Sequence, residues 1–210
     1  MNEQEIPHDH AGLEIDSEAG YYAARSKAIE SLLVDKGIIT ALEVDREVNI
    51  LDSKSPADGA KIVARAWLDN TFRAKLLTDA SEALAEIGYD LPDKTPYLKV
   101  VENTEEVHYV VVCTLCSCYP RMLLGRPPDW YKSLSYRSRV VVDPRSVIGE
   151  FGLHLSPDIE VRVLDSTADM RYMVIPKRPK GTDGMTEELL ASLVTRDSMI
   201  GVSAAVSPVS

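Results

Sequence analysis

Apolar residues in the N-terminal part of the chain recur at the spacing of an α-helix. Between residues 18 and 36 they fall three or four positions apart, and Gly37 follows where a helix C-cap is expected. Thr40 and Glu43 then have the spacing of a capping box, which predicts a second helix ending near Leu51. The pattern therefore predicts two helices joined by a short turn.

The chain is then interrupted and becomes helical again. Residues 52–59 are rich in Ser, Pro and Asp, which predicts a break. A third helix is predicted over residues 60–68, and a fourth over residues 71–87, where Gly88 ends it. The whole N-terminal part is therefore predicted to be helical.

The pattern changes to strands after a linker. Residues 90–96 contain two prolines and predict that linker. Residues 98–101 and 107–114 are rich in β-branched side chains and predict two strands. Residues 119–132 contain three prolines, so we expect a loop there.

Helix and strand signals are mixed in the remainder of the chain. Asp143 and Pro144 predict an N-cap followed by proline at the first helical position, and Gly152 predicts the end of that helix. Two further strands are predicted over residues 159–164 and 171–175, and a helix capped by Thr186 over residues 186–194.

These elements predict an α+β protein. Its parts are a disordered tail over residues 1–17, a helical N-terminal arm over 18–89, an α/β domain over 97–202 and a tail over 203–210. The N-terminal helices have no closing partner for their apolar faces within their own segment. They form either a subdomain packed on the α/β part or an arm that embraces another subunit.

Charge and hydropathy exclude several functions. The formal net charge of -10 repels a phosphate backbone, so we expect no nucleic-acid partner. No segment approaches the roughly 18 consecutive apolar residues of a membrane helix. Residues 1–16 lack the order of a secretory signal. We therefore expect a cytoplasmic protein without a membrane partner.

The cysteines carry the candidate chemistry. All three, Cys113, Cys116 and Cys118, fall within six consecutive positions. A disulfide framework favours an even number of separated cysteines, and structural zinc favours four ligands. An iron–sulfur cluster needs a fourth ligand, which no other cysteine of the sequence supplies. A zinc knuckle shared between subunits, three unrelated buried thiols and a trivalent metal ion remain as interpretations.

The spacing Cys-x-x-Cys-x-Cys favours wrapping of the backbone around one ion. Cys116 and Cys118 can meet the same ion only if the chain between them curves around it, which brings the amide nitrogens of Ser117 and Cys118 close. Three thiolates and two deprotonated amides form a strong ligand field that suits Co(III) or Fe(III). Such an ion is a Lewis acid with a sixth position open, and its thiolates are prone to oxidation.

The residues around this cluster resemble a known family. Residues 112–120 (Val-Cys-Thr-Leu-Cys-Ser-Cys-Tyr-Pro) resemble the metal-binding signature of nitrile hydratase α subunits, and Thr114 resembles the cobalt-type variant. The resemblance extends over residues 20–202. Further similar stretches are residues 101–104, 127–132, 136–140, 143–145, 171–172 with Pro176, and 195–201.

The resemblance implies a site and an activity. It implies Cys113 as an axial thiolate, Cys116 as a sulfinic acid and Cys118 as a sulfenic acid, with the amides of Ser117 and Cys118 completing the ligands of one Co(III) per chain, or alternatively Fe(III). Ser117 and Cys118 are then also the catalytic residues, in the hydration of a small nitrile to its amide. It further implies a helical arm before a layered α-β-β-α domain, a β-type partner subunit and an activator or metallochaperone.

Two departures from the family pattern concern the substrate. Arg121 and Met122 stand where the family commonly has Trp-Pro, and the related thiocyanate hydrolase γ subunit has Arg there. Residues 90–96 lack the family's Gln-Gly-Glu loop. The alternatives are therefore a thiocyanate hydrolase catalytic subunit, in which Arg121 suits an anion, and a non-catalytic paralogue that carries cobalt.

Further charged residues resemble the family's supporting groups. Asp165, Asp169 and Arg171 are expected either to orient the cluster loop or to form a surface salt bridge. Lys132 either pairs with the negative charge of the cluster or lies on the surface. Together with Arg121 they complete the candidate site.

Overall fold

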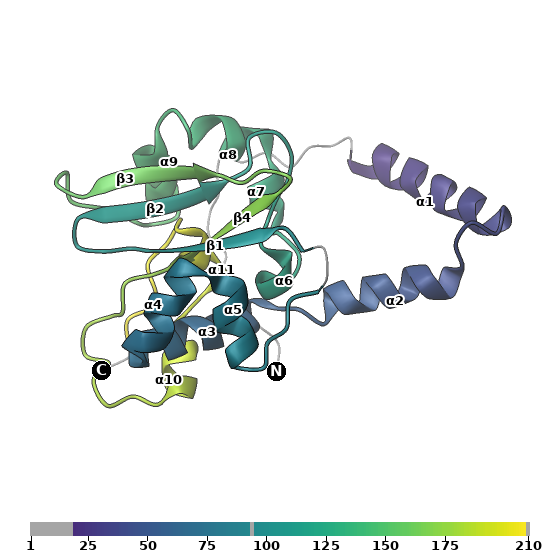
Figure 1. The fold of residues 1–210 in the computed structure, drawn as a ribbon. Coiled ribbons are helices and arrows are strands. Elements are labelled where there is room, and N and C mark those ends of the chain that lie inside the picture. The colour runs from purple at the N-terminus through teal and green to yellow at the C-terminus, as the bar shows by residue number, and fades with distance from the viewer. Residues whose placement is uncertain (1–18, 93–94, 209–210) are drawn as a thin grey trace.

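The computed structural model describes residues 19–92 and 95–208 of the chain. The tail predicted over residues 1–17 lies outside the described residues, and so does the end of the tail predicted over 203–210. Figure 1 shows two helices that extend away from a body in which the other elements pack together.

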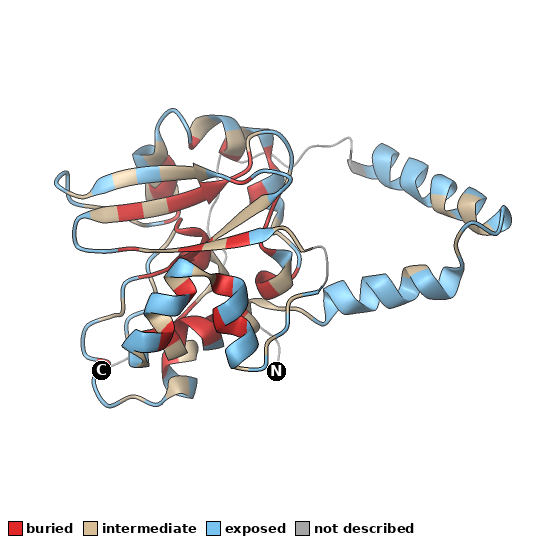
Figure 2. Cartoon of the chain, in the orientation of Figure 1, coloured by how far each residue is buried: buried red, intermediate tan, exposed pale blue. Residues whose placement is uncertain are grey.

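The two projecting helices are α1 (Ala19–Asp35) and α2 (Ala41–Asp52). Gly37 has a φ of 65° between them, and its amide donates to the Val34 carbonyl over 2.9 Å. The side chain of Thr40 accepts from the Glu43 amide in a complete capping box. Both predicted helices and their caps are confirmed. Neither helix contains a buried residue among those described (Figure 2).

Three helices follow and belong to the body: α3 (Pro56–Leu68), α4 (Asn70–Thr78) and α5 (Ala80–Glu86). The predicted start of α3 at residue 60 was wrong, because Pro56 occupies the first helical position, where no amide donor is needed. The single helix predicted over residues 71–87 was also wrong. Asp79 leaves the helical conformation, at φ -137° and ψ 102°, and caps a new helix through the Glu82 amide.

The strands form two parallel pairs. They are β1 (Tyr97–Glu102), β2 (Val107–Val112), β3 (Glu160–Asp165) and β4 (Met170–Ile175). β1 pairs with β4, and β2 pairs with β3, so that Val112 lies opposite Asp165. All four predicted strands are confirmed, within one or two residues at their ends. The register brings the carboxylate of Asp165 to the place where the cysteine segment begins.

Short helices complete the body: α6 (Arg121–Leu124), α7 (Asp129–Lys132), α8 (Leu134–Arg139), α9 (Pro144–Glu150), α10 (Glu187–Ala191) and α11 (Arg196–Ile200). α9 confirms the prediction based on Asp143, and α10 confirms the cap at Thr186 but ends at Ala191, before the predicted end at Val194. The loop predicted over residues 119–132 was wrong, because Pro120 and Pro128 are N-caps of short helices rather than breakers. The sequence patterns also missed α8 and α11.

These elements are layered as helix, strand, strand and helix. α4 and α5 contact β1, β2 contacts β4, and α9 contacts β3 on the other side (Figure 1). The expected α+β class and the layering implied by the family resemblance are both confirmed. Buried residues are concentrated in this body, to which α3, α4 and α5 also contribute (Figure 2). The division into an arm over 18–89 and a domain over 97–202 stays a prediction.

One buried polar network ties β2 to the end of α11. His108 donates from Nε2 to the carbonyl of Gly201 over 2.7 Å, so its Nδ1 is the acceptor for the Asn103 side-chain amide at 3.1 Å. Gly201 has a φ of 86°, and a Cβ there would lie 1.9 Å from the Tyr109 carbonyl oxygen. This close approach requires glycine and allows the bond to His108.

Among the described residues, no helix has the length and apolarity needed to cross a membrane. A cytoplasmic location stays a prediction.

Candidate metal centre

Strand β2 leads directly into the cysteine segment, residues 113–118, which has no regular secondary structure. Cys113 and Cys118 are buried, and Cys116 is exposed. The Sγ atoms of Cys113 and Cys116 are 3.4 Å apart, and those of Cys116 and Cys118 are 3.1 Å apart. All three sulfur atoms lie within 4.8 Å of one another. The described residues therefore bring three thiols to one point, where they could hold a metal ion.

The three thiols differ in their tendency to ionise. Hydrogen bonds from the thiols of Cys118 and Cys113 lower the pKa of Cys116. Burial raises the pKa of Cys118 to about 12, and the neighbouring Cys116 thiol adds to that increase. Cys116 is thus the thiol that ionises more readily of these two. A cation between the sulfur atoms would favour the thiolate of Cys118 as well.

Two charged side chains bind the backbone at the start of the cysteine segment. The carboxylate of Asp165 accepts from the Thr114 amide over 2.9 Å and from the Thr114 hydroxyl over 2.5 Å. Arg137 donates from Nε to the Cys113 carbonyl over 3.1 Å and from Nη2 to the Thr114 carbonyl over 2.8 Å. These bonds hold the backbone of a segment that is itself neither helix nor strand.

Two buried tyrosines bind the chain on either side of the thiols. The Tyr131 hydroxyl donates to the Cys118 carbonyl over 2.8 Å, and the Tyr136 hydroxyl donates to the Val111 carbonyl over 2.7 Å. Burial raises the pKa of both hydroxyls above the usual tyrosine value, so both remain neutral donors. The ring of Trp130 packs edge-on against both tyrosine rings.

The expected supporting residues have different surroundings. Asp165 contacts the cysteine segment as described above. Arg171 donates to the backbone carbonyls of Thr167 and Met170, and its charge acts to lower the pKa of Cys118. The exposed Asp169 contributes a backbone carbonyl to β1, and Lys132 forms an ion pair with Asp129 over 2.6 Å.

Arg121 is exposed at the start of α6 and lines a cavity of about 200 Å³. Two other cationic side chains, Lys54 and Arg171, line the same cavity, together with Tyr119 from the end of the cysteine segment. No acidic residue is among the described residues that line it. The remaining lining residues are Ile50, Leu51, Pro92, Thr95, Pro96 and Met122.

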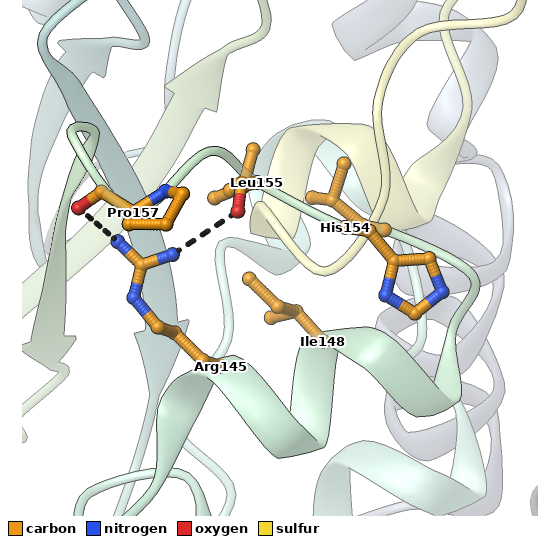
Figure 3. Close-up of a pocket in the computed structure, with 6 residues that line it drawn as sticks. Arg145, Ile148, His154, Leu155 and Pro157 are labelled. Atoms are coloured by element: carbon orange, nitrogen blue, oxygen red, sulfur yellow. Dashed lines mark hydrogen bonds between the residues drawn. The ribbon is translucent and has the colours of Figure 1, made fainter.

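A second cavity, of about 370 Å³, lies beside α9 (Figure 3), and no cysteine is among the described residues that line it. Arg145 lines it, and its guanidinium donates to the carbonyls of Leu155, Ser156 and Pro157. These contacts connect α9 to the segment that leads into β3. The donors of the Arg145 guanidinium are thus bonded to the backbone of this segment.

Arg137, Tyr131 and Tyr136 were not identified as site residues from the sequence. They lie in stretches that resemble the family, but nothing local indicates their partners. Their bonds to the cysteine segment and to Val111 join residues 13 to 25 positions apart in the sequence. The sequence around these residues therefore gave no signal that they contact the cysteine segment.

The site is therefore a cluster of three cysteine thiols that could hold a metal ion, carried on a layered α/β body. Residues 20–203 match the family model described as "Nitrile hydratase, alpha chain". The chain belongs to the nitrile hydratase α-chain family, which confirms the resemblance found in the sequence.

Several proteins are similar to this chain over most of its length. The high-molecular-weight cobalt-containing nitrile hydratase subunit alpha of Rhodococcus rhodochrous is 52% identical, over 89% of this chain and 93% of that protein. The cobalt-containing subunit alpha of Pseudonocardia thermophila is 50% identical, over 87% of this chain and 90% of that protein. The thiocyanate hydrolase subunit gamma of Thiobacillus thioparus is 40% identical, over 84% of this chain and 76% of that protein.

Solved structures agree with this assignment. A double mutant of the Fe-type nitrile hydratase from Comamonas testosteroni Ni1 superposes with a TM-score of 0.82 at 41% identity, covering 91% of this chain and 94% of that one. A recombinant thiocyanate hydrolase with partially modified cobalt centres has a TM-score of 0.82 at 38% identity, covering 91% of both chains.

Proposed function

We propose that this chain is the metal-binding subunit of an enzyme that hydrates a nitrile to the corresponding amide at a non-corrin Co(III) centre. The observation that carries the proposal is the convergence of the three sulfur atoms within 4.8 Å, on a segment whose backbone is held by other parts of the fold. The cobalt-containing relatives, about half identical to this chain, support cobalt over the alternative, Fe(III).

The proposed ligands are the sulfur atoms of Cys113, Cys116 and Cys118 and the amide nitrogens of Ser117 and Cys118. This donor set suits a small trivalent ion, because thiolates and deprotonated amides form a strong ligand field. When bound, the ion supplies a Lewis acid that makes the nitrile carbon electrophilic. The chain contributes the shape of the site, since the backbone on both sides of the ligands is bonded to buried side chains.

Two of the sulfur atoms are proposed to be oxidised by dioxygen, Cys116 by four electrons to a sulfinic acid and Cys118 by two electrons to a sulfenic acid. Cys116 is exposed and has the lowered pKa, which favours the reactive thiolate. Sγ of Cys113 accepts a hydrogen bond from the Cys116 amide over 3.2 Å. Cys113 and Cys118 are both buried, so the choice of Cys118 rather than Cys113 as the second oxidised ligand rests on the family resemblance.

In the proposed reaction, one water adds across the carbon–nitrogen triple bond. The oxygen that attacks the carbon comes from water or from the Cys118 sulfenate, and in the second case water restores the sulfenate. A proton then moves from oxygen to nitrogen, which converts R–C≡N and H₂O into R–C(O)NH₂. Exclusion of bulk water by a partner chain would keep the attacking oxygen oriented.

A β-type subunit and an activator that loads the metal are the proposed partners. The helices α1 and α2 support the first partner, because they expose large apolar side chains away from the body (Figure 2). Those more than half exposed are Tyr21, Tyr22, Ile29, Leu32 and Leu42. Such a surface on a projecting element is typical of an interface with another chain.

The proposal is tested by producing the chain in cobalt medium together with a β-type chain and an activator. The purified assembly is expected to contain about one cobalt per chain and to convert acrylonitrile to acrylamide. The same assembly with Cys113→Ala is the matched control. An assembly that contains cobalt but converts neither nitriles nor thiocyanate would contradict the proposal and support the cobalt-carrying paralogue.

Thiocyanate hydrolysis is a second candidate, favoured by the cationic cavity. Arg121, Lys54 and Arg171 line it without an acidic residue among those described, which suits an anion such as N≡C–S⁻. The relative from Thiobacillus thioparus supports the same possibility. In that reaction two water molecules convert thiocyanate into carbonyl sulfide, ammonia and hydroxide. Measuring ammonia release from thiocyanate by the same assembly distinguishes the two substrates.

A further inference from the structure

The peptide group between Cys113 and Thr114 is bound on both of its edges. Its carbonyl oxygen accepts from Nε of Arg137 over 3.1 Å, and its N–H donates to the carboxylate of Asp165 over 2.9 Å. In a trans peptide the carbonyl and the N–H point in opposite directions. The two charged side chains therefore approach this peptide group from opposite sides and fix its orientation.

Each of the two side chains makes a second bond to Thr114. Arg137 uses Nη2 to reach the Thr114 carbonyl at 2.8 Å, and Asp165 reaches the Thr114 hydroxyl at 2.5 Å. The planar guanidinium presents donors at fixed angles, so Arg137 can bind two successive carbonyls at once. A lysine ammonium carries the same charge but lacks this arrangement of donors.

Both side chains come from regular elements of the body, the exposed Asp165 from β3 and the half-buried Arg137 from α8. Asp165 is the last residue of β3 and lies opposite Val112 in the parallel pair. Arg137 lies in α8 directly after Tyr136, whose ring is fully buried and whose hydroxyl binds the Val111 carbonyl. Consecutive residues of α8 thus bind the carbonyls of residues 111, 113 and 114. The end of β2 and the first turn of the cysteine segment share one support.

The bound peptide determines where the next ligand lies. Beyond Thr114 the chain turns so that the Cys116 amide donates to Sγ of Cys113 over 3.2 Å, and the two sulfur atoms are 3.4 Å apart. Rotation of the held peptide would move Cys116 relative to Cys113. The half-buried guanidinium also places a positive charge beside a segment that supplies three thiolates.

We propose that Arg137 is a positioning residue of the metal centre, acting with Asp165 to set the separation of the first two sulfur ligands. The proposal rests on the proposed function only in that the thiols hold a metal ion. Arg137 touches neither substrate nor metal; it acts through the backbone of Cys113 and Thr114. Groups that orient metal ligands in this way change metal affinity or activity by roughly 10–100-fold when they are replaced.

The test compares Arg137→Lys and Arg137→Gln with the control Arg139→Lys, in the cobalt-loaded assembly with its partner chain. Arg139 lies on the same helix but pairs with Glu150, away from the thiols. Cobalt per chain and the visible sulfur-to-cobalt absorption band are measured for each variant. Both Arg137 variants are expected to lose most of their cobalt and to shift the band, because each lacks the paired donors. Arg139→Lys is expected to match the unmodified protein.

A second comparison separates positioning from simple loss of folding. Asp165→Asn weakens the bond to the N–H of the same peptide group. The double variant with Arg137→Lys should therefore lose less cobalt than the sum of the two single losses. In the variants that do load, kcat should fall while KM changes little, and the midpoint of thermal unfolding without metal should stay close to that of Arg139→Lys. Additive effects, or equal loss of cobalt in the Arg139 control, would overturn the proposal.

The outcomes also distinguish this proposal from the proposed function. If the assembly without substitutions binds cobalt but hydrates no substrate, only the proposed function is contradicted. Cobalt content and the absorption band would still report on the role of Arg137. Arg137 variants with normal cobalt content and an unchanged band would overturn only the positioning role. An unmodified assembly that binds no metal would contradict both.

Discussion

Two regions of this molecule differ most in how their structure is held. They are the helices α1 and α2, and the cysteine segment, residues 113–118. The helices are regular, capped and exposed, and none of their described residues is buried. The cysteine segment has no regular structure, yet side chains from α7, α8 and β3 bind its backbone. One region is ordered by bonds within itself, and the other by bonds to distant parts of the chain.

This difference shows which properties of the two regions can change independently. Packing in the body contributes little to α1 and α2, so their surface is free to be shaped for a partner. The cysteine segment depends on bonds from Tyr131, Arg137 and Asp165, and the loss of the buried Tyr131 hydroxyl would leave the Cys118 carbonyl without its partner. Substitutions are therefore expected to act on assembly in the first region and on the metal in the second.

The largest expected effect is the loss of the metal when a thiol is removed. Single replacement of Cys113, Cys116 or Cys118 by Ala removes an anionic ligand and should abolish cobalt retention after dialysis against a chelator. Elemental analysis measures the loss. Leu42→Ala in α2 is the matched control and should retain the full cobalt content. Retention in all three cysteine variants would show that the metal is held elsewhere.

Stability should separate the two regions almost as clearly. Leu98 is fully buried in β1, whereas Leu42 is 78% exposed. Leu98→Ala should lower the free energy of unfolding by about 2–5 kcal/mol, because it leaves a cavity in the core. Leu42→Ala should change it by less than about 0.5 kcal/mol while weakening assembly with the partner. Denaturant unfolding of the isolated chain and a titration with the β-type chain measure the two effects.

The sequence was most informative where local bonds determine the structure. The capping box at Thr40 and the glycine after α1 predicted both projecting helices, because those signals lie within a few residues of the bonds they form. The break at Asp79 was missed, since a capping aspartate within a helical pattern has no effect on hydrophobic periodicity.

For the site, the sequence predicted the convergence of the three thiols but only part of the side chains that bind the backbone around them. Cys113, Cys116 and Cys118 are close in sequence, so their convergence could be expected from spacing alone. Asp165 was expected through the family resemblance, and the parallel register of β2 and β3 explains its place. Arg137 could not be found, because its contact with Cys113 depends on how α8 packs against a residue 24 positions earlier in the sequence.

A smaller effect is expected where the two regions meet. The cavity that contains Arg121 is lined by the end of α2 and by Tyr119 of the body. Arg121→Trp should favour simple apolar nitriles and weaken an anionic or hydrogen-bond-accepting substrate by about 1–3 kcal/mol, the scale of a lost charged hydrogen bond. Values of kcat/KM for acrylonitrile, a heteroaromatic nitrile and thiocyanate in both variants test this.

The same substitution has a different outcome if Arg121 pairs with an acidic residue of the partner. Assembly would then weaken, and the ratios of kcat/KM among the three substrates would stay unchanged. Unchanged ratios would mean that Arg121 does not select the substrate, and ordinary nitrile hydration would be favoured.

The smallest expected effect is a pH dependence confined to the body. Burial lowers the pKa of His108 from its ordinary value of 6.5, and the charge of Arg145 adds to that decrease. The folded protein therefore prefers neutral His108, and its stabilising effect is complete above about pH 6.5. Below that pH the unfolded chain takes up a proton that the folded chain resists. Stability should then fall by up to about 1.4 kcal/mol per pH unit until His108 protonates in the folded state.

His108→Gln removes this titration and should flatten that part of the profile of unfolding free energy against pH. Residues 19–52 contain no histidine, so changes in α1 and α2 should leave the part of the profile near pH 6.5 unaltered. Identical profiles for the unmodified protein and His108→Gln would contradict the assignment of a neutral buried His108.

These thiols are proposed to hold a trivalent cobalt ion and to be oxidised in its presence. Intact-mass and peptide mass spectrometry of the active assembly, combined with elemental analysis, test both properties together. About one cobalt per chain is expected, with added oxygen on the peptide that contains Cys116 and Cys118, none on Cys113 and none in protein made without cobalt. Active protein with three unmodified thiols, or with stoichiometric zinc in place of cobalt and iron, would contradict this proposal.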